Sequence, residues 1–335
     1  MAIPEKKPYE RLSDYLERSL PAELEAGKSR GKATADIIAK FNEEPPREMF
    51  APFIWGATNA SGSAGGGAGD ADADAYLAAV VSAGGTTDAT IEAAVQTLFT
   101  SLKSNSLYTK LDLFYPFIGG VAASNALNGI RTNSAYDITW NGSLTFNTLG
   151  VTGTGTNGDY GNTNYNWSTE AASNSVAWGI YNTAGNFGDN ISEVYSHGGF
   201  DGTYLNAHVG TPTNMELRGW VVGEAYGGTS IAVPKTSDGQ AVGTFNTSTS
   251  TKKLYWNADV LGYLSGARVV SGGIGLANQT EFLFTLNING NPYSGNYWNG
   301  RLSFFWIGEY LNDIEVETIS QIITTFNTDL GREVY

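Results

Sequence analysis

Short apolar segments separated by tight-turn signals most limit how residues 110–307 can fold. Each segment has the length of a single strand, and the pairs Asn-Gly and Asp-Gly between them tolerate the left-handed backbone of tight turns. Many strands without intervening helices predict a β-sandwich or jelly roll. The predicted strands are 111–117, 139–140, 144–146, 175–181, 216–222, 230–233, 243–246, 253–256, 281–286 and 301–307.

The composition agrees with a turn-rich β body. Glycine accounts for 42 of the 335 residues, and charged residues make up only 16% of the chain. Cysteine is absent, which excludes disulfides, zinc–thiolate sites and cysteine nucleophiles. We therefore expect stability to come from packing or from association with other chains.

A last amphipathic helix is predicted to follow the final strand. Asn312 is placed to cap its N-terminus, with Glu315 completing a capping box, and Gly331 stands at a C-cap position. One stripe of this helix is apolar and must be buried against another part of the chain. The nearest apolar surface in the sequence is the predicted strand at 304–307. The stripe consists of Val316, Ile319, Ile322, Ile323, Phe326 and Leu330.

Residues 70–106 are predicted to form a helical hairpin. The alternating acids of Asp70-Ala71-Asp72-Ala73-Asp74 resemble the start of a calcium loop, but Ala75 and Val81 stand where such a loop needs Gly and Glu. These acids instead favour a helix N-terminus. A second helix is expected from Asp88, with an apolar stripe from Ile91 to Leu102.

The first 50 residues differ from the rest of the chain in their charge density. Residues 1–50 contain 9 Lys and Arg and 10 Asp and Glu, so their charge density is about threefold that of the remainder. Short helices are expected at 9–18 and 33–41, with apolar faces too narrow to bury a core. We divide the chain into a charged segment 1–60, a glycine-rich linker 61–69, the helical hairpin 70–106 and a sandwich 107–335. The linker lacks the Lys-Ser/Thr pair of a phosphate-binding loop.

The charge and hydropathy of the chain exclude several partners. A net charge of −14 disfavours nucleic acid and anionic membrane surfaces. No apolar run reaches the roughly 18 residues of a membrane span, and the first residues lack the apolar core of a signal peptide. We expect synthesis in a cytosol without membrane insertion.

Two stretches resemble a known family. The run WIGEYLNDIEVETISQIITTFNTDLGR, residues 306–332, resembles the last strand and closing helix of concanavalin A-like (laminin-G-like) jelly rolls in bacteriophage virion proteins. The run LYTKLDLFYPFIGGVAASNALNGI, residues 107–130, is similar to a segment that precedes such domains. The resemblance spans roughly residues 76–332. No family binding site can be transferred with it.

The resemblance implies a structural protein of the phage virion, made in the host cytoplasm. Tail fibre, head fibre and capsid decoration are its candidate positions, and the sandwich would serve host attachment or surface decoration. Segment 1–60 would fold on other virion proteins and anchor the chain. Self-association, as a trimer in a fibre, is a further expectation from the resemblance.

Catalysis is not expected. Because jelly rolls also occur in glycanases, a glycan-cleaving enzyme is the first alternative, and a purely architectural virion protein without ligand is the second. A retaining glycosidase needs two carboxylates about 5–5.5 Å apart, and the strand segments carry their acids singly. The closest group, Asp313, Glu315 and Glu317, stands where acids favour a helix start.

Histidine and metal chemistry find little support in the sequence. His197 and His208 are eleven residues apart, and no Gly-x-Ser-x-Gly elbow accompanies them. No cofactor is predicted. Asp159 and Asn162 are a candidate pair of calcium ligands, although a pair alone is weak evidence for a Ca²⁺ site.

Aromatic residues in two Gly/Asn-rich stretches are the candidate carbohydrate-binding residues. Both stretches, DYGNTNYNW and NPYSGNYWNG, read as loops in which rings could stack on sugars while Asn, Asp and Thr bond to hydroxyls. The alternative is that these rings cover the sandwich edges or lie at a subunit interface. The candidates are Tyr160, Tyr165, Trp167, Tyr293, Tyr297 and Trp298.

Overall fold

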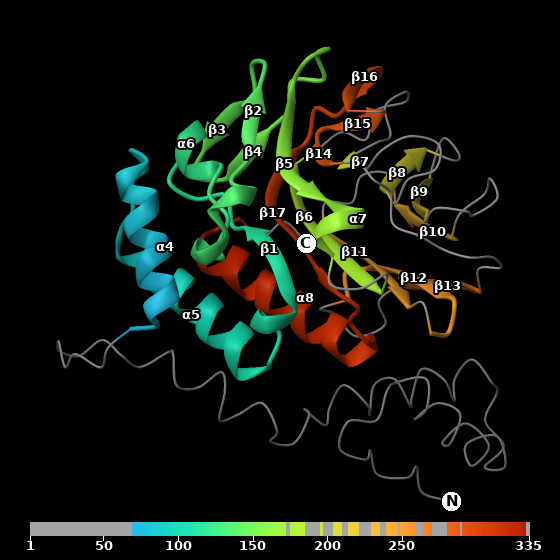
Figure 1. Cartoon of the computed structure of the whole chain (residues 1–335), viewed down its shortest axis with the longest axis horizontal. Helices are drawn as coiled ribbons and strands as arrows, with labels where there is room; N and C mark the ends of the chain where they lie inside the picture. The colour runs from blue at the N-terminus through green and yellow to red at the C-terminus, as the bar shows by residue number, and fades with distance from the viewer. Residues whose placement is uncertain are drawn as a thin grey trace, which may run out of the picture. The chain divides into compact units, whose positions relative to one another are not determined.

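The computed structural model places residues 68–335 in one compact unit (Figure 1). The expected helices at 9–18 and 33–41, the segment 1–60 and nearly all of the linker lie outside the described residues. The described residues are 69–171, 175–184, 195–196, 204–209, 214–220, 229–234, 239–246, 248–258, 264–269, 280–288 and 290–332.

An eight-stranded antiparallel sheet forms the centre of the fold. Its strands run in the order β13-β12-β11-β6-β17-β4-β3, and β1 also pairs with β17. The bounds are β1 Leu111–Tyr115, β3 Thr145–Asn147, β4 Gly150–Thr152, β6 Val176–Ala184, β11 Gly239–Asn246, β12 Thr251–Trp256, β13 Leu264–Val269 and β17 Arg301–Glu309.

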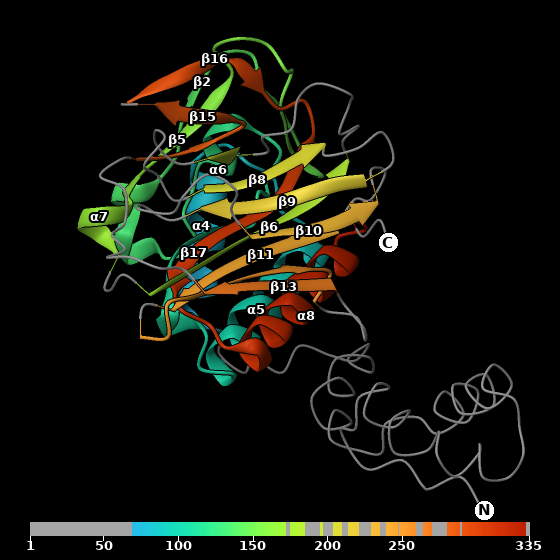
Figure 2. The same ribbon diagram turned by 90° about the vertical axis from the view of Figure 1, so that its right-hand side faces the viewer.

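A six-stranded sheet lies against one side of the first, in the order β16-β15-β7-β14-β5-β2. Its pairs are antiparallel except for β15 with β7. The bounds are β2 Thr139–Asn141, β5 Tyr160–Asn166, β7 Tyr195–Ser196, β14 Thr280–Leu283, β15 Thr285–Ile288 and β16 Asn291–Tyr297. A third sheet of three strands, β8 Tyr204–Val209, β9 Asn214–Trp220 and β10 Thr229–Pro234, is visible in Figure 2.

The eight-stranded sheet is apolar on both faces. Along β17, Phe305 and Ile307 join the cluster shared with the six-stranded sheet, whereas Phe304 and Trp306 join a second cluster shared with the helices. Successive strand residues point to opposite faces, so a continuous apolar run requires a covering layer on each side. The fold therefore has three layers, which are sheet, sheet and helices.

The helical layer consists of α4 Ala71–Ser82, α5 Ala89–Ser104 and α8 Asp313–Asp329. Figure 2 shows α5 and α8 side by side beneath the eight-stranded sheet. Phe326 of α8 meets Phe304 of β17 edge to face, with ring centroids 5.8 Å apart. The predicted destination of the last helix is thus confirmed.

Side-chain caps begin all three helices of this layer, and the predicted cap at Asn312 is one of them. The Asp70 side chain accepts from the backbone N–H groups of Asp72 and Ala73, and the Asp88 side chain accepts from that of Ile91. Asn312 and Glu315 form a reciprocal capping box. The remaining short helices are η1 Tyr108–Lys110, α6 Ala122–Asn125, η2 Arg131–Tyr136 and α7 Trp167–Glu170.

The predicted fold class is confirmed, because the described chain is mainly antiparallel β-sheet and is closed by a C-terminal helix. Each of the ten predicted strand segments overlaps an observed strand. Among the helices that the structure describes, none is long and apolar enough to cross a membrane.

Candidate functional site

The strands β2, β5 and β14 of the six-stranded sheet turn a row of polar and aromatic side chains away from the core. Thr139 of β2, Asn162 of β5 and Phe282 of β14 lie in register across three strands, and Asn141 and Tyr160 form the adjacent row. Directly opposite residues of antiparallel strands share a face. We call Thr139, Asn141, Tyr160, Asn162 and Phe282 the outer face.

Tyr160 is the aromatic centre of the outer face. Its ring stacks on that of Phe282 with centroids 4.7 Å apart and an interplanar angle of 28°. Phe282 is buried, whereas Tyr160 is half-buried, so the phenol ring covers Phe282 with one side and remains partly accessible. Thr139 is exposed, and Asn141 and Asn162 are half-buried.

The opposite face of the same strands packs into the core. Trp140, Gly161 and Leu283 form the row that alternates with the outer face, and Leu283 is fully buried. A Cβ atom on Gly161 would approach the Trp140 ring to 2.4 Å, so only glycine lets this ring cross β5. The packing of Trp140 thus fixes which side of β2 and β5 faces outward.

The first predicted aromatic stretch is a strand and not a loop. Asp159 to Trp167 contributes β5 and the start of α7, with Tyr165 and Trp167 buried. Tyr165 donates its hydroxyl to Asp112 Oδ2 at 2.7 Å, and Trp167 meets Trp178 edge to face. The loop prediction is wrong here because pairing with β2 and β14 extends the segment. Tyr165 and Trp167 therefore offer no ring face to a ligand.

The second predicted stretch is also largely a strand, β16, which ends at Tyr297. Tyr297 and Trp298 are 3% and 1% exposed, and Trp298 stacks on Phe284 with centroids 5.6 Å apart. These two rings also belong to the interior. The side chain of Tyr293 lies outside the described residues, so Tyr160 is the described candidate that keeps an accessible ring.

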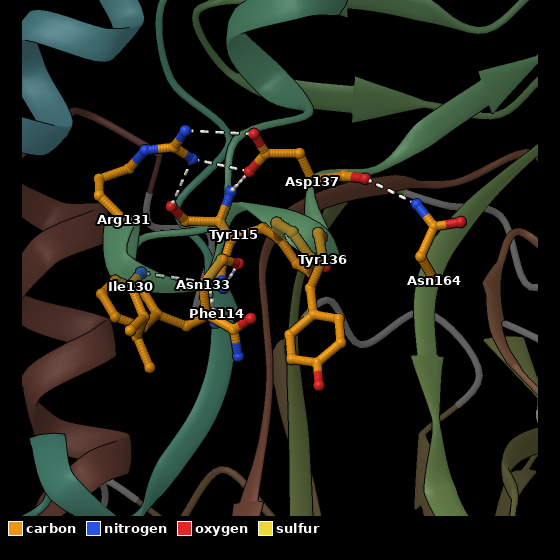
Figure 3. A network of polar contacts seen from close by, with 9 residues as sticks. Phe114, Tyr115, Ile130, Arg131, Asn133, Tyr136, Asp137 and Asn164 are labelled. Carbon is orange, nitrogen blue, oxygen red and sulfur yellow. Dashed lines mark hydrogen bonds and ion pairs between the residues drawn. The ribbon is translucent and has the colours of Figure 1, made fainter. Parts of the chain in front are cut away.

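A polar network holds β2 in place beside β5 (Figure 3). Arg131 binds Asp137 in a bidentate ion pair, with Nη1–Oδ1 and Nη2–Oδ2 distances of 2.7 and 3.2 Å. The Asp137 carbonyl accepts from Asn164 Nδ2 of β5 at 2.9 Å. Asp137 comes two residues before Thr139, so the network fixes the strand that carries two outer-face residues.

Buried Asn128 is the centre of this network. Its backbone N–H donates to Asp137 Oδ1 at 2.8 Å, and its side-chain oxygen accepts from the N–H groups of Phe114 and Ile130. A buried amide with these partners ties β1 to the segment that leads into β2. Sequence reasoning missed Asn128, since a lone Asn in a Gly/Asn-rich stretch gives no signal of burial.

Asp159 stabilises the turns next to the outer face and is not placed as a calcium ligand together with Asn162. Its carboxylate accepts from the Ser143 N–H at 2.7 Å and from the Thr154 hydroxyl. Asn162 points to the outer face, and its side-chain oxygen accepts from the Asn164 N–H. Within the described part of the chain, no three His, Cys, Asp or Glu residues are grouped as metal ligands would be.

Glu281 is a carboxyl group enclosed in the core below the outer face. It is 2% exposed, and its Oε2 accepts from Trp167 Nε1 at 2.7 Å. Burial raises the pKa of Glu281 to about 8, which the hydrogen bond from Trp167 opposes. Burial likewise raises the pKa of Asp112. In the sequence Glu281 is the single acid of the predicted strand segment 281–286, and nothing there indicates that it is buried.

The acids at the start of α8 have structural partners. Asp313 Oδ1 accepts from Lys253 Nζ at 2.6 Å and from the Tyr255 hydroxyl at 2.8 Å. Glu315 completes the capping box and pairs with Lys110. His197, and the side chain of His208, lie outside the described residues.

Comparisons with known proteins give distant structural similarity. No protein-family model matches the chain, and no curated protein matches it. Domain 4 of AbnA, an extracellular arabinanase from Geobacillus stearothermophilus solved with arabinotriose, is 15% identical with a TM-score of 0.42; the match covers 63% of this chain and 98% of that domain.

Two further solved structures are similar at the same level. A botulinum neurotoxin type C structure, whose cell entry is described as dependent on two ganglioside molecules, is 12% identical with a TM-score of 0.45, covering 68% of this chain and 53% of that chain. A SAP-like pentraxin from Limulus polyphemus is 16% identical with a TM-score of 0.35, covering 44% and 70%. At these TM-scores the similarities carry no argument about the site.

Proposed function

We propose that this chain is a carbohydrate-binding structural protein of a bacteriophage particle, and that its outer face holds the glycan without chemical turnover. The observation that carries the binding proposal is the half-buried ring of Tyr160, stacked on Phe282 and flanked by Asn141, Asn162 and Thr139. The virion role rests separately on the sequence resemblance and on the charged segment 1–60.

The chemistry of the outer face suits a sugar. A pyranose ring presents apolar C–H groups on one side and hydroxyl groups around its edge. The Tyr160 ring offers a surface for the C–H groups, while the amides and the hydroxyl beside it supply both donors and acceptors. Phe282 below Tyr160 and the Asn164–Asp137 bond beside it fix the platform in advance, which lowers the entropic cost of binding.

The substitution Tyr160→Ala tests the binding proposal. We expect at least a tenfold loss of affinity for any glycan that the unchanged chain captures from an immobilised glycan array. Tyr160→Phe should retain most of the affinity, since it keeps the ring. Tyr108→Ala is the matched control, because Tyr108 is also half-buried and also contacts a phenylalanine, Phe99, but lies on the helical side.

The outcomes of this test separate the alternatives. Equal binding by the Tyr160→Ala chain and the unchanged chain, with equal melting temperatures, would refute the outer face as the site. Absence of binding to every glycan would favour the purely architectural protein, which the burial of Tyr165, Trp167, Tyr297 and Trp298 also favours. Release of new reducing ends from a bound polysaccharide would favour the glycan-cleaving enzyme.

Removal of residues 1–60 tests the virion proposal. We expect the shortened chain to remain folded, since residues 68–335 form a compact unit, and to lose incorporation into phage particles. Particles are purified from lysates of cells that express either chain and are probed with an antibody against the sandwich. Incorporation of the shortened chain at the level of the full chain would contradict attachment through 1–60.

A further inference from the structure

The entire six-stranded sheet is built without lysine or arginine. The sequence has neither residue between Arg131 and Arg218, nor between Arg268 and Arg301. Strands β2, β5 and β7 come from the first of these stretches, and β14, β15 and β16 come from the second. The connections within each stretch lack both residues too, so the sheet and its sequence-adjacent loops contribute no permanent positive charge.

Six lysines and arginines elsewhere in the chain have described side chains, and each of these has a partner. Those with described side chains are bound on the helical layer, on the network around Asp137 or on the central sheet. The pairs are Lys103 with Asp70 and Asp72, Lys110 with Glu315, Arg131 with Asp137, Lys253 with Asp313, Arg301 with Thr152, and Arg332 with the carbonyl groups of Pro116 and Ser303.

Two described carboxyl groups next to the outer-face residues, those of Asp159 and Glu281, are turned away from the outer face. Asp159 is 3% exposed and binds the Ser143 N–H, and Glu281 is enclosed against Trp167. The groups that the outer face presents are therefore uncharged. They are the Tyr160 ring, the amides of Asn141 and Asn162 and the hydroxyl of Thr139. Around it lies a chain whose net charge is −14.

We infer that the ligand of the outer face is a neutral oligosaccharide, and that sialylated, sulfated or uronic-acid glycans are excluded. This inference rests on the proposed carbohydrate site. An anionic sugar would lose water from its carboxylate or sulfate on binding, and the six-stranded sheet has no lysine or arginine to replace that water. The negative field of the chain would also slow its approach. The hydroxyl groups of a neutral sugar are not repelled by this field, and the amides and hydroxyl of the outer face can replace the water that they lose.

A glycan array tests this selectivity on the full chain. The array presents neutral galactose-, glucose- and N-acetylhexosamine-terminated oligosaccharides beside their sialylated, sulfated and uronic-acid counterparts. We expect a neutral ligand to bind at least tenfold more tightly than its acidic counterpart, with little change between 50 and 500 mM NaCl. If an acidic glycan binds as tightly as its neutral counterpart or more tightly, and Tyr160→Ala removes this binding, the predicted selectivity is wrong but the proposed site is still supported. Binding to no glycan would overturn both.

A placed charge gives a second, independent readout. Thr139→Lys adds a cation at an exposed position of the outer face, and should raise the affinity for acidic glycans at least fivefold, in a manner that high salt removes. Thr100→Lys adds the same charge at an exposed position of α5 and should leave that affinity unchanged. Equal gains by the two variants would show a general charge effect and would contradict the inference.

Discussion

Replacing Glu281 by glutamine should stabilise the protein at neutral pH. The pKa of Glu281 is raised from 4.5 to about 8 by burial. Between these values the folded chain keeps the proton and the unfolded chain loses it, so the free energy of unfolding falls as the pH rises. At about 1.36 kcal/mol for each pH unit above 4.5, the loss reaches about 3 kcal/mol at pH 7. Glutamine avoids this loss and still accepts from Trp167 Nε1.

Urea unfolding followed by tryptophan fluorescence at pH 5, 7 and 8.5 measures the effect. The stability difference between Glu281→Gln and the unchanged chain should be small at pH 5, about 3 kcal/mol at pH 7 and larger at pH 8.5. Glu92→Gln is the control, because Glu92 is exposed on α5. A difference that stays constant over the three pH values would refute the argument that the core holds Glu281 in its protonated form.

Two pairs of substitutions, each a test and its control, probe the turn at Asp159 and the buried Arg332. Gly142→Ala should cost about 3 kcal/mol, because Gly142 has φ +81° and its Cβ would lie 2.0 Å from Asp159 Oδ1. Gly158→Ala is the control, because Gly158 has φ +100° and no atom lies within 4 Å of its Cβ position. It should cost only the backbone strain, about 1 kcal/mol. Equal losses of unfolding free energy for Gly142→Ala and Gly158→Ala in urea would contradict the role of Asp159. Arg332→Met should cost about 3 kcal/mol, because the buried guanidinium donates to the carbonyls of Pro116 and Ser303. Arg301→Met is the control, because Arg301 is half-buried and its bond to Thr152 is 3.4 Å long. It should cost less than about 1 kcal/mol. A larger fall in melting temperature for Arg301→Met than for Arg332→Met would contradict the argument.

The helices could be predicted because their determinants are local. Asp70, Asp88 and Asn312 cap the helices that they were expected to start, and Gly331 adopts φ +66° just after α8. A cap depends on residues within one turn of itself, so its signal survives in a single sequence. The strands were found for the related reason that apolar segments and turn residues alternate along the chain.

The candidate rings could not be placed in the same way. The stretch of β5 is rich in Asn and Gly, which are poor strand formers, and it is a strand only because β2 and β14 pair with it. One local signal was present, since Thr163, Tyr165 and Trp167 recur at every second residue and are all buried. That alternation indicates a strand with an inward aromatic face, and it leaves Tyr160 and Asn162 for the outward face.

Buried charge was the least predictable feature. Glu281 and Arg332 are ordinary surface residue types, and their burial follows from contacts with Trp167, Pro116 and Ser303, which are 29 to 216 residues away in sequence. Neither spacing nor composition records such contacts. The pKa of Arg332 is lowered to about 9 by burial, and two backbone carbonyls serve as its partners in place of a carboxylate.

The apolar residues on both faces of the eight-stranded sheet explain why a helix follows the last strand. Phe304 and Trp306 on β17, Val242 on β11 and Tyr255 on β12 all face away from the second sheet, and each is at most 1% exposed. In a two-layer sandwich these side chains would meet water, at a cost of about 2 kcal/mol each. Helices α5 and α8 cover them, so the hairpin and the last helix are parts of the same core as the strands. The outer face is carried by the six-stranded sheet, on the side of the sandwich opposite to α5 and α8.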